Sequence, residues 1–527
     1  MMGLAPRKVK VRKHLFLVFA VLAILSASGR RLSSDTPRRL NLARAVTAQA
    51  NGIPSVQSDE SAHITHIENG LLPAVTIKGQ PTPAMTIWER MKHYNVPGVS
   101  VAFFDRGQIL WTRTYGFADL ANQKPVTTAT LFQAASISKP VSALAALRLV
   151  QDGKLTLDGD VNAKLRSWKV PESEFTGEQK VTLRRILSHS AGLTVHGFPG
   201  YAVGEPLPTI VEVLNGEKPA NTPPIRVDTV PGTLWRYSGG GYVIMQLLLT
   251  DVTGESFPQL LRDLVLQPAG MTHSTFDQPL PENLSSVAAT PYRGDGKPVK
   301  GGWHTYPEMA AAGLWTTPSD LARLAIELQK EYSGKSSKIL SQATMREMLA
   351  PEKGIWGLGF EVVAPSHTPY FGHAGANEGF RCDLEAYTES QGFVIMTNSD
   401  NGDLLDEEVL RAVSKEYGWP DIKPKERTLV DIDPELLSAY SGTYEGPETG
   451  TQIVSVRDNK IYIQVNPLGP PEPEELYPES ATDFFILSRN VTFSFRKDAQ
   501  GVVSELVMHN GTQDYEAKKL SSSDLRH

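Results

Sequence analysis

The pattern of apolar residues changes at residues 421–433, and this change constrains the fold more than any other feature of the chain. Before it, segments with helical and with strand periodicity are mixed, whereas after it only short alternating segments follow. The segment itself is rich in proline and charge, as linkers are. Because 527 residues also exceed what one hydrophobic core usually organises, we predict two folded domains. They are a mixed domain over residues 84–420 and an all-β domain over residues 434–520, followed by a tail at 521–527.

Local patterns place several elements in the first domain. Two β-rich runs, 99–104 and 108–112, flank Asp105-Arg106-Gly107 and predict a hairpin. Apolar residues at helical spacing predict a helix over 140–152, which Gly153 would end. The later elements are a helix capped by Thr317, a strand over 393–397 and an amphipathic helix over 403–417.

The second domain shows only strand patterns. Residues 452–457 and 460–465 alternate around Asp458-Asn459, and residues 491–496 and 502–508 flank a turn that ends in Gly501. We therefore expect an all-β domain of antiparallel hairpins there.

Charge and cysteine content exclude several classes of site. A net charge of −6 provides no basic field for phosphate backbones, so nucleic acid is not an expected partner. Cys382 is the only cysteine, which excludes an intramolecular disulfide and a cysteine-based zinc site. No metal ion or cofactor is predicted.

Residues 1–28 have the pattern of an export signal. Basic residues between Arg7 and Lys13 precede an apolar run over 15–25 and small residues at 26–28. The run is shorter than the about 20 residues of a membrane-spanning helix, so a signal peptide is favoured, and an uncleaved anchor that tethers the protein to a membrane stays open. We expect an exported protein, periplasmic or extracellular.

Residues 29–83 show little periodicity and are predicted to be a flexible lead-in. His63 and His66 lie there three residues apart. No third histidine stands close in sequence, so we interpret them as surface histidines and not as a metal pair.

The chemistry centres on Ser136-Ile137-Ser138-Lys139, which places a hydroxyl and an amine one helical turn apart. A lysine with a lowered pKa can take the proton of a serine and make it a nucleophile. A serine at a helix start also has backbone N–H groups available for an oxyanion. Ser494 and Lys497 share the spacing, but they lie in a predicted strand, which puts their side chains on opposite faces.

The stretch over residues 130–158 resembles the nucleophile region of the class C β-lactamase-related serine hydrolases, which use an S-x-x-K motif. Further segments resemble landmarks of this family; they are Asn95-Val96-Pro97-Gly98, LSHSAGL at 187–193 and GLWTTPSDL at 313–321. The resemblance covers about residues 80–420. It implies an α+β fold of the β-lactamase/transpeptidase type, with an antiparallel sheet flanked by helices and a helical subdomain.

The same resemblance assigns roles to further residues. Tyr237-Ser238 matches the start of the family's Tyr-x-Asn element, which implies that Tyr237 relays protons between nucleophile, Lys139 and leaving group. His373-Ala374-Gly375 resembles the Lys-Thr-Gly or His-x-Gly strand. His373 would then assist electrostatically, Gly375 would contact substrate, and the backbone N–H of Ala376 would join that of Ser136 as the oxyanion hole.

One position departs from the family pattern. Gly239 stands where Tyr-x-Asn has asparagine, whose amide helps the resembled enzymes to bind the carbonyl of a β-lactam or acyl-D-amino-acid substrate. A site without that partner loses discrimination for such substrates. We therefore expect small esters or short peptides to be better substrates than cephalosporins.

Other motifs receive structural interpretations. His189 is expected to be structural and not a base, and Cys382 a packed free cysteine. Gly239-Gly240-Gly241 lacks the lysine and the serine or threonine of a phosphate-binding loop. A Ser-His-Asp hydrolase is the competing mechanism, but its G-x-S-x-G motif occurs nowhere in the chain.

Three functions remain open. The first is a serine hydrolase that acts through an acyl-enzyme on small esters, peptides or amides, of carboxypeptidase, esterase or β-lactamase type. The second is a penicillin-binding receptor that is acylated but turns over poorly, and the third is a scaffold with a residual site. Because the four site residues are all present, the first is favoured. The domain at 434–520 resembles the small lipocalin-like antiparallel barrel that some family members carry, and we expect it to restrict substrates.

Overall fold

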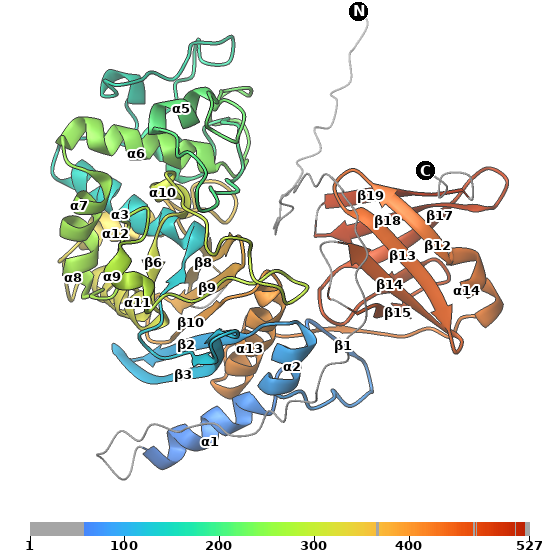
Figure 1. The fold of residues 1–527 in the computed structure, drawn as a ribbon. Helices are drawn as coiled ribbons and strands as arrows, with labels where there is room; N and C mark the ends of the chain where they lie inside the picture. Colours follow the sequence, from blue (N-terminus) through green and yellow to red (C-terminus); the bar gives the residue numbers. More distant parts are fainter. Residues whose placement is uncertain (1–56, 365–367, 467–469, 471, 512, 522–527) are drawn as a thin grey trace, which may run out of the picture.

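The computed structural model describes residues 57–364, 368–466, 470, 472–511 and 513–521 (Figure 1). They form an α+β domain followed by a closed antiparallel barrel, so the predicted fold classes of both parts are confirmed. The predicted signal sequence at 1–28 lies outside the described residues. Within the described residues, no helix combines the length and apolarity that a membrane crossing requires.

A seven-stranded antiparallel sheet forms the centre of the first domain, in the order β4-β3-β2-β10-β9-β8-β7. Its strands are β2 (Gly98–Asp105), β3 (Gln108–Asp119), β4 (Lys124–Pro125), β7 (Glu361–Val363), β8 (Tyr370–Asn377), β9 (Phe380–Tyr387) and β10 (Gly392–Thr397). The predicted hairpin and the predicted strand at 393–397 are confirmed as β2–β3 and β10. Arg106 and Gly107 have φ of 48° and 77°, as a tight hairpin turn requires.

Helices cover both faces of this sheet (Figure 1). Val99, Val101 and Phe103 of β2 face one core, which is shared with α1 (Gln57–Glu68), α2 (Ile87–His93) and α13 (Gly402–Glu416). Ala102 and Phe104 face the opposite core, shared with α3 (Ser138–Gln151) and α11 (Pro318–Tyr332). This alternation follows from the two-residue period of a strand. The predicted helices at 140–152, after Thr317 and at 403–417 are thereby confirmed.

The remaining helices of this domain form its helical part, of which α5 and α6 lie at the top of Figure 1. They include α4 (Leu183–Leu187), α5 (Ile210–Asn215), α6 (Gly239–Thr253), α7 (Phe257–Leu261), α8 (Gln267–Ala269), α9 (Glu282–Ser285), α10 (Met309–Ala312) and α12 (Gln342–Met348). Of these, α6 is buried along most of its length and contacts α3, α4, α5 and α10. This part therefore supports the region where α3 begins.

The prediction of a flexible lead-in over 29–83 is wrong for residues 57–77. Helix α1 packs on α13, and β1 (Val75–Ile77) pairs in parallel with β11 (Lys425–Arg427). His63 and His66 both lie against Glu416 Oε1, with Nδ1 at 2.7 and 3.0 Å, and so connect α1 to the end of α13. Sequence periodicity misses such a segment because its order comes from residues about 350 positions away.

The closed barrel follows α14 (Pro434–Tyr440) and has aromatic and aliphatic side chains inside. Its strands are β12 (Gly442–Gly446), β13 (Gly450–Arg457), β14 (Lys460–Asn466), β15 (Glu474–Pro478), β16 (Asp483–Phe485), β17 (Thr492–Lys497), β18 (Val503–Asn510) and β19 (Gln513–Lys519). Both predicted hairpins are confirmed, as β13–β14 and β17–β18.

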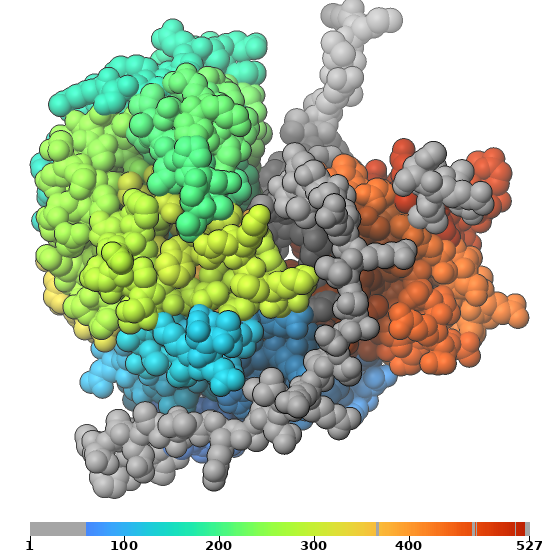
Figure 2. All heavy atoms as spheres, viewed as in Figure 1, coloured from blue at the N-terminus to red at the C-terminus, as the bar shows by residue number. Residues whose placement is uncertain are grey.

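The barrel, orange to red in Figure 2, contacts the first domain. A small apolar cluster and several polar contacts join the two parts. Val75 donates its N–H to the Leu487 carbonyl at 3.1 Å, and its side chain packs with Phe485. Arg489 lies 2.8 Å from Asp403 at the start of α13. The ordered β1 segment therefore forms part of the surface on which the barrel rests.

Candidate active site

Ser136 lies in a single 3-10 turn, Ala135–Ile137, that leads directly into α3. Ala135 has a φ of 47°, an unfavourable value for a residue with a Cβ, and such strain is concentrated at functional sites. The preceding residues are held by the GLWTTPSDL segment. Ala134 donates its N–H to the Leu314 carbonyl at 2.8 Å, and Leu314 donates to Ser138 Oγ at 2.9 Å. These bonds set the position of the serine turn.

Lys139 is buried one turn further along α3. Its Nζ donates to Ser136 Oγ at 3.0 Å and to the Ala311 carbonyl at 2.9 Å. Burial lowers the pKa of Lys139 to about 7, because a charged ammonium loses its hydration there. A substantial neutral fraction at physiological pH is therefore available to accept the Ser136 proton.

Tyr237 reaches the same point from the start of α6. Its phenol lies near enough to the Ser136 side chain for the two groups to interact, and Lys139 Nζ lies 4.9 Å from the centre of its ring. Burial raises the pKa of Tyr237, so the group is a neutral phenol that can donate a proton. Lys139, and not Tyr237, is thus the group in this pair that can act as a base near neutral pH.

His373 approaches Tyr237 from strand β8. Its Nδ1 lies 2.6 Å from the Ala374 carbonyl and therefore carries a proton, which leaves Nε2 as an acceptor 3.5 Å from the Tyr237 hydroxyl. Burial, with a further contribution from the Lys139 charge, lowers the pKa of His373 to about 3. The ring is neutral, so the predicted electrostatic assistance reduces to accepting a hydrogen bond from Tyr237.

The predicted oxyanion-hole residues lie on two segments in contact, the serine turn and β8. A Cβ on Gly375 would lie 2.4 Å from the Ala134 carbonyl and 3.2 Å from Ala135 Cβ. Glycine is therefore required there for the strand to approach the turn, and this packing explains the residue without any contact to substrate. Ala376 follows it directly and is half-buried.

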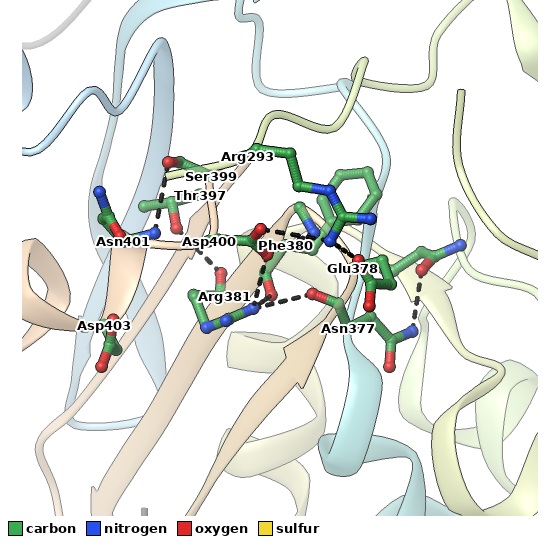
Figure 3. Close-up of polar contacts among 12 residues, drawn as sticks. Arg293, Asn377, Glu378, Phe380, Arg381, Thr397, Ser399, Asp400, Asn401 and Asp403 are labelled. Atoms are coloured by element: carbon green, nitrogen blue, oxygen red, sulfur yellow. Dashed lines mark hydrogen bonds and ion pairs between the residues drawn. The ribbon is translucent and has the colours of Figure 1, made fainter. Parts of the chain in front are cut away.

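A polar network fixes the end of β8 (Figure 3). Arg293 forms an ion pair with Glu378 and lies 3.5 Å from Asp400, and Asp400 accepts the Gly379 N–H at 2.8 Å. Asn377, next to Ala376, donates to the Gln133 side chain at 2.8 Å. These residues hold the strand and the segment before Ser136 in one arrangement. No local signal in the sequence identifies this network, because Arg293, Glu378 and Asp400 come from three separate loops.

His189, in the LSHSAGL segment, stacks on the Tyr237 ring with centroids 4.2 Å apart and an interplanar angle of 26°. Its Nδ1 accepts the Ser238 N–H at 3.1 Å, and burial keeps its pKa well below the usual value. The neutral His189 ring therefore packs against Tyr237 and helps to position it. Trp356, which sequence reasoning missed, packs edge-on against both rings, at 4.8 and 5.6 Å.

Two other singled-out residues, Cys382 and Ser494, form no hydrogen bond with Ser136 or Lys139 among the described contacts. Cys382 is buried on β9, with Sγ 3.1 Å from the Ala134 carbonyl. Ser494 lies on barrel strand β17, where its hydroxyl lies 2.5 Å from Asp483 Oδ1 and 2.9 Å from His509 Nε2. Neither partner is Lys497, so the matched S-x-x-K spacing does not form a serine–lysine pair there.

Comparisons with known proteins agree with this architecture. A family model described as "Beta-lactamase" matches residues 85–415, and one described as a domain of unknown function (DUF3471) matches residues 426–522. Penicillin-binding protein 4* of Bacillus subtilis is 22% identical over 459 residues, which cover 81% of this chain and 96% of that protein. Esterase EstB of Burkholderia gladioli is 32% identical over 201 residues, which cover 36% of this chain and 49% of that protein.

A solved structure shares the fold. The octameric penicillin-binding protein homologue from Pyrococcus abyssi superposes with a TM-score of 0.53 at 21% identity, over 82% of this chain and 98% of that one. At this identity the likeness concerns the fold alone.

Proposed function

Because the chain belongs to the beta-lactamase family, we propose that it hydrolyses small esters, peptides or amides through an acyl-enzyme on Ser136. The observation that carries this proposal is the 3.0 Å contact between Ser136 Oγ and Lys139 Nζ, combined with the burial that lowers the lysine pKa to about 7. A buried amine with this pKa is suited to act as a general base at neutral pH.

Each proton has a defined route in this mechanism. As Ser136 Oγ bonds to the substrate carbonyl carbon, its proton passes to Lys139 Nζ. The backbone N–H groups of Ser136 and Ala376 would stabilise the oxyanion. The bond to the leaving group breaks as the Tyr237 hydroxyl protonates it, and Tyr237 recovers a proton from Lys139. In the deacylation step, a water molecule bonds to the acyl carbon, and Lys139 and Tyr237 transfer its proton to Ser136 Oγ. The bond between Ser136 Oγ and the acyl carbon then breaks and the acid is released.

The test is intact-mass measurement after incubation with p-nitrophenyl acetate, a D-alanyl-D-alanine peptide and benzylpenicillin. We expect at least one acyl adduct that Ser136→Ala abolishes and that Ser494→Ala, the matched serine in the barrel, retains. An adduct of the same mass on Ser136→Ala would contradict the proposal. A burst of product followed by a flat trace would identify the receptor that is acylated but turns over poorly.

We also propose that the protein acts outside the cytoplasm. The pattern of residues 1–28 supports export, and the chemistry of the site suits a small ester, peptide or β-lactam substrate in the periplasm or outside the cell. Fractionation of the producing cells tests this, because retention in the cytoplasm would contradict it.

A further inference from the structure

Trp356 lies on the connection between α12 and β7, and its side chain is only 5% exposed. Its ring meets three rings of the candidate site edge-on. The centroid distances are 4.8 Å to His189, 5.6 Å to Tyr237 and 5.5 Å to His373. These values lie in the range that aromatic pairs prefer. One side chain therefore contacts rings from the LSHSAGL segment, the start of α6 and strand β8.

The loop that carries Trp356, residues 350–357, is fastened to the segment that leads into Tyr237. Lys353 Nζ donates to the Gly232 carbonyl at 3.0 Å and to the Thr233 carbonyl at 3.3 Å. Next to these bonds, the Trp235 ring stacks on Trp356 with centroids 5.7 Å apart and an interplanar angle of 25°. The position of Trp356 is thereby coupled to that of the chain just before Tyr237.

Other contacts hold the 350–357 loop from outside the site. Glu352 forms an ion pair with Arg184 at 2.8 Å, and Arg184 binds two further carboxylates. Within the loop, Glu352 donates its N–H to the Trp356 carbonyl at 2.7 Å, and Trp356 donates its N–H to the Lys353 carbonyl at 3.1 Å. These bonds fix the backbone of Trp356 without any contact to Ser136 or Lys139.

The Tyr237 hydroxyl depends on ring packing for its position. Its distance of 3.5 Å to His373 Nε2 is longer than a good hydrogen bond, so this contact alone does not hold it. Trp356 touches both of these rings and so sets the space between them. Catalytic groups are sensitive to such placement, since an error of about 1 Å can cost about a hundredfold in rate.

We propose that Trp356 is a positioning residue that holds Tyr237 where it protonates the leaving group. The inference rests on the proposed acyl-enzyme at Ser136. In that step the bond between the acyl carbon and the leaving-group oxygen breaks as the Tyr237 hydroxyl proton passes to that oxygen. A p-nitrophenolate leaves as a stable anion without this proton, whereas an alkoxide needs it. Trp356 thus decides whether the site can cleave alkyl esters as well as activated aryl esters.

The experiment compares ethyl acetate with p-nitrophenyl acetate, which share the acetyl group, by following acid release in a pH-stat. The quantity is kcat/KM, which excludes the deacylation step that both substrates have in common. Trp356→Leu should lower kcat/KM for ethyl acetate about tenfold more than for p-nitrophenyl acetate, a part of the about hundredfold that a lost acid–base group costs. Trp356→Phe keeps an aromatic edge and should restore most of this selective loss.

Two further variants separate positioning from general stability. Trp419→Leu removes another buried indole, which packs on Phe103 and Tyr387. It should lower the unfolding temperature and leave the ratio of the two kcat/KM values unchanged. Lys353→Met releases the 350–357 loop from Gly232 without altering any ring, and should shift the ratio in the same direction as Trp356→Leu, by about twofold or more.

An unchanged ratio in Trp356→Leu, equal losses for both esters, or no recovery in Trp356→Phe would overturn the inference. Thermal unfolding shows whether each variant is folded. Should Trp356→Leu not fold, Lys353→Met decides, and an unchanged ratio in that variant would overturn the inference. A failure of the underlying proposal is recognised separately, because turnover of both esters would then persist in Ser136→Ala.

Discussion

Lys139 Nζ lies 3.0 Å from Ser136 Oγ, and burial lowers the pKa of this lysine from 10.5 to about 7. The helix supplies the contact, since residues three apart share a face. The pKa comes from the side chains and backbone that enclose the amine, including the Ala311 carbonyl that it contacts. The first prediction follows from this pair.

Turnover should rise with pH through about 7 and then level off. Below that pH Lys139 is protonated and cannot take the Ser136 proton, whereas above it the amine is neutral. The measurement is kcat/KM for p-nitrophenyl acetate between pH 5 and pH 9. Burial also raises the pKa of Glu308 to about 7, so Glu308→Gln serves as the control and should keep the profile. A flat profile in the native protein would exclude Lys139 as the base.

Lys139→Ala and Tyr237→Phe should each slow acyl transfer by about a hundredfold or more, the usual effect of losing an acid–base group. Tyr237→Phe keeps the ring that packs on His189 and removes only the hydroxyl that interacts with Ser136 and His373. Single-turnover acylation rates check this. Near-normal rates in either variant would show that protons take another route.

A chain that ends at Asp433 should still be acylated at Ser136, because the whole constellation precedes that residue. It should unfold at a lower temperature, since it loses the Leu487 carbonyl that Val75 bonds and the Arg489–Asp403 ion pair. Thermal unfolding and intact mass measure the two effects, and Arg489→Met in the full chain isolates the ion pair. We also expect altered relative rates on the ester and peptide substrates. Unchanged relative rates would show that the barrel does not restrict substrates.

A p-nitrophenyl ester should be hydrolysed with a higher kcat/KM than a chromogenic cephalosporin on the same preparation. Gly239 offers no amide to a cephalosporin, and a Cβ at this position would lie 3.0 Å from both the His196 carbonyl oxygen and the Phe198 ring, which is a tight contact. Gly239→Asn should not raise cephalosporin turnover, because the new side chain would meet the His196 carbonyl and the Phe198 ring. A cephalosporin value equal to or above the ester value would refute this expectation.

Features that depend on neighbouring residues could be predicted from the sequence. The hairpin β2–β3, the helix that carries Lys139 and the change to an all-β domain all follow from periodicity and turn residues, which are local properties. The order of the family landmarks likewise allowed Tyr237 and His373 to be named together with Ser136 before their positions were known.

Other properties were decided only by the tertiary structure. They arise where segments that are distant in the sequence enclose an ionisable side chain or pack on each other. The neutral state of His373 and the lowered pKa of Lys139 come from burial, which no local pattern encodes. The ordering of α1 and β1 comes from contacts with residues more than 300 positions away. The placement of Trp356 beside Tyr237 depends on contacts between two loops, such as that of Lys353 with Gly232. The sequence by itself therefore determined which groups could do the chemistry, and the packing of the folded chain decided their charge and their neighbours.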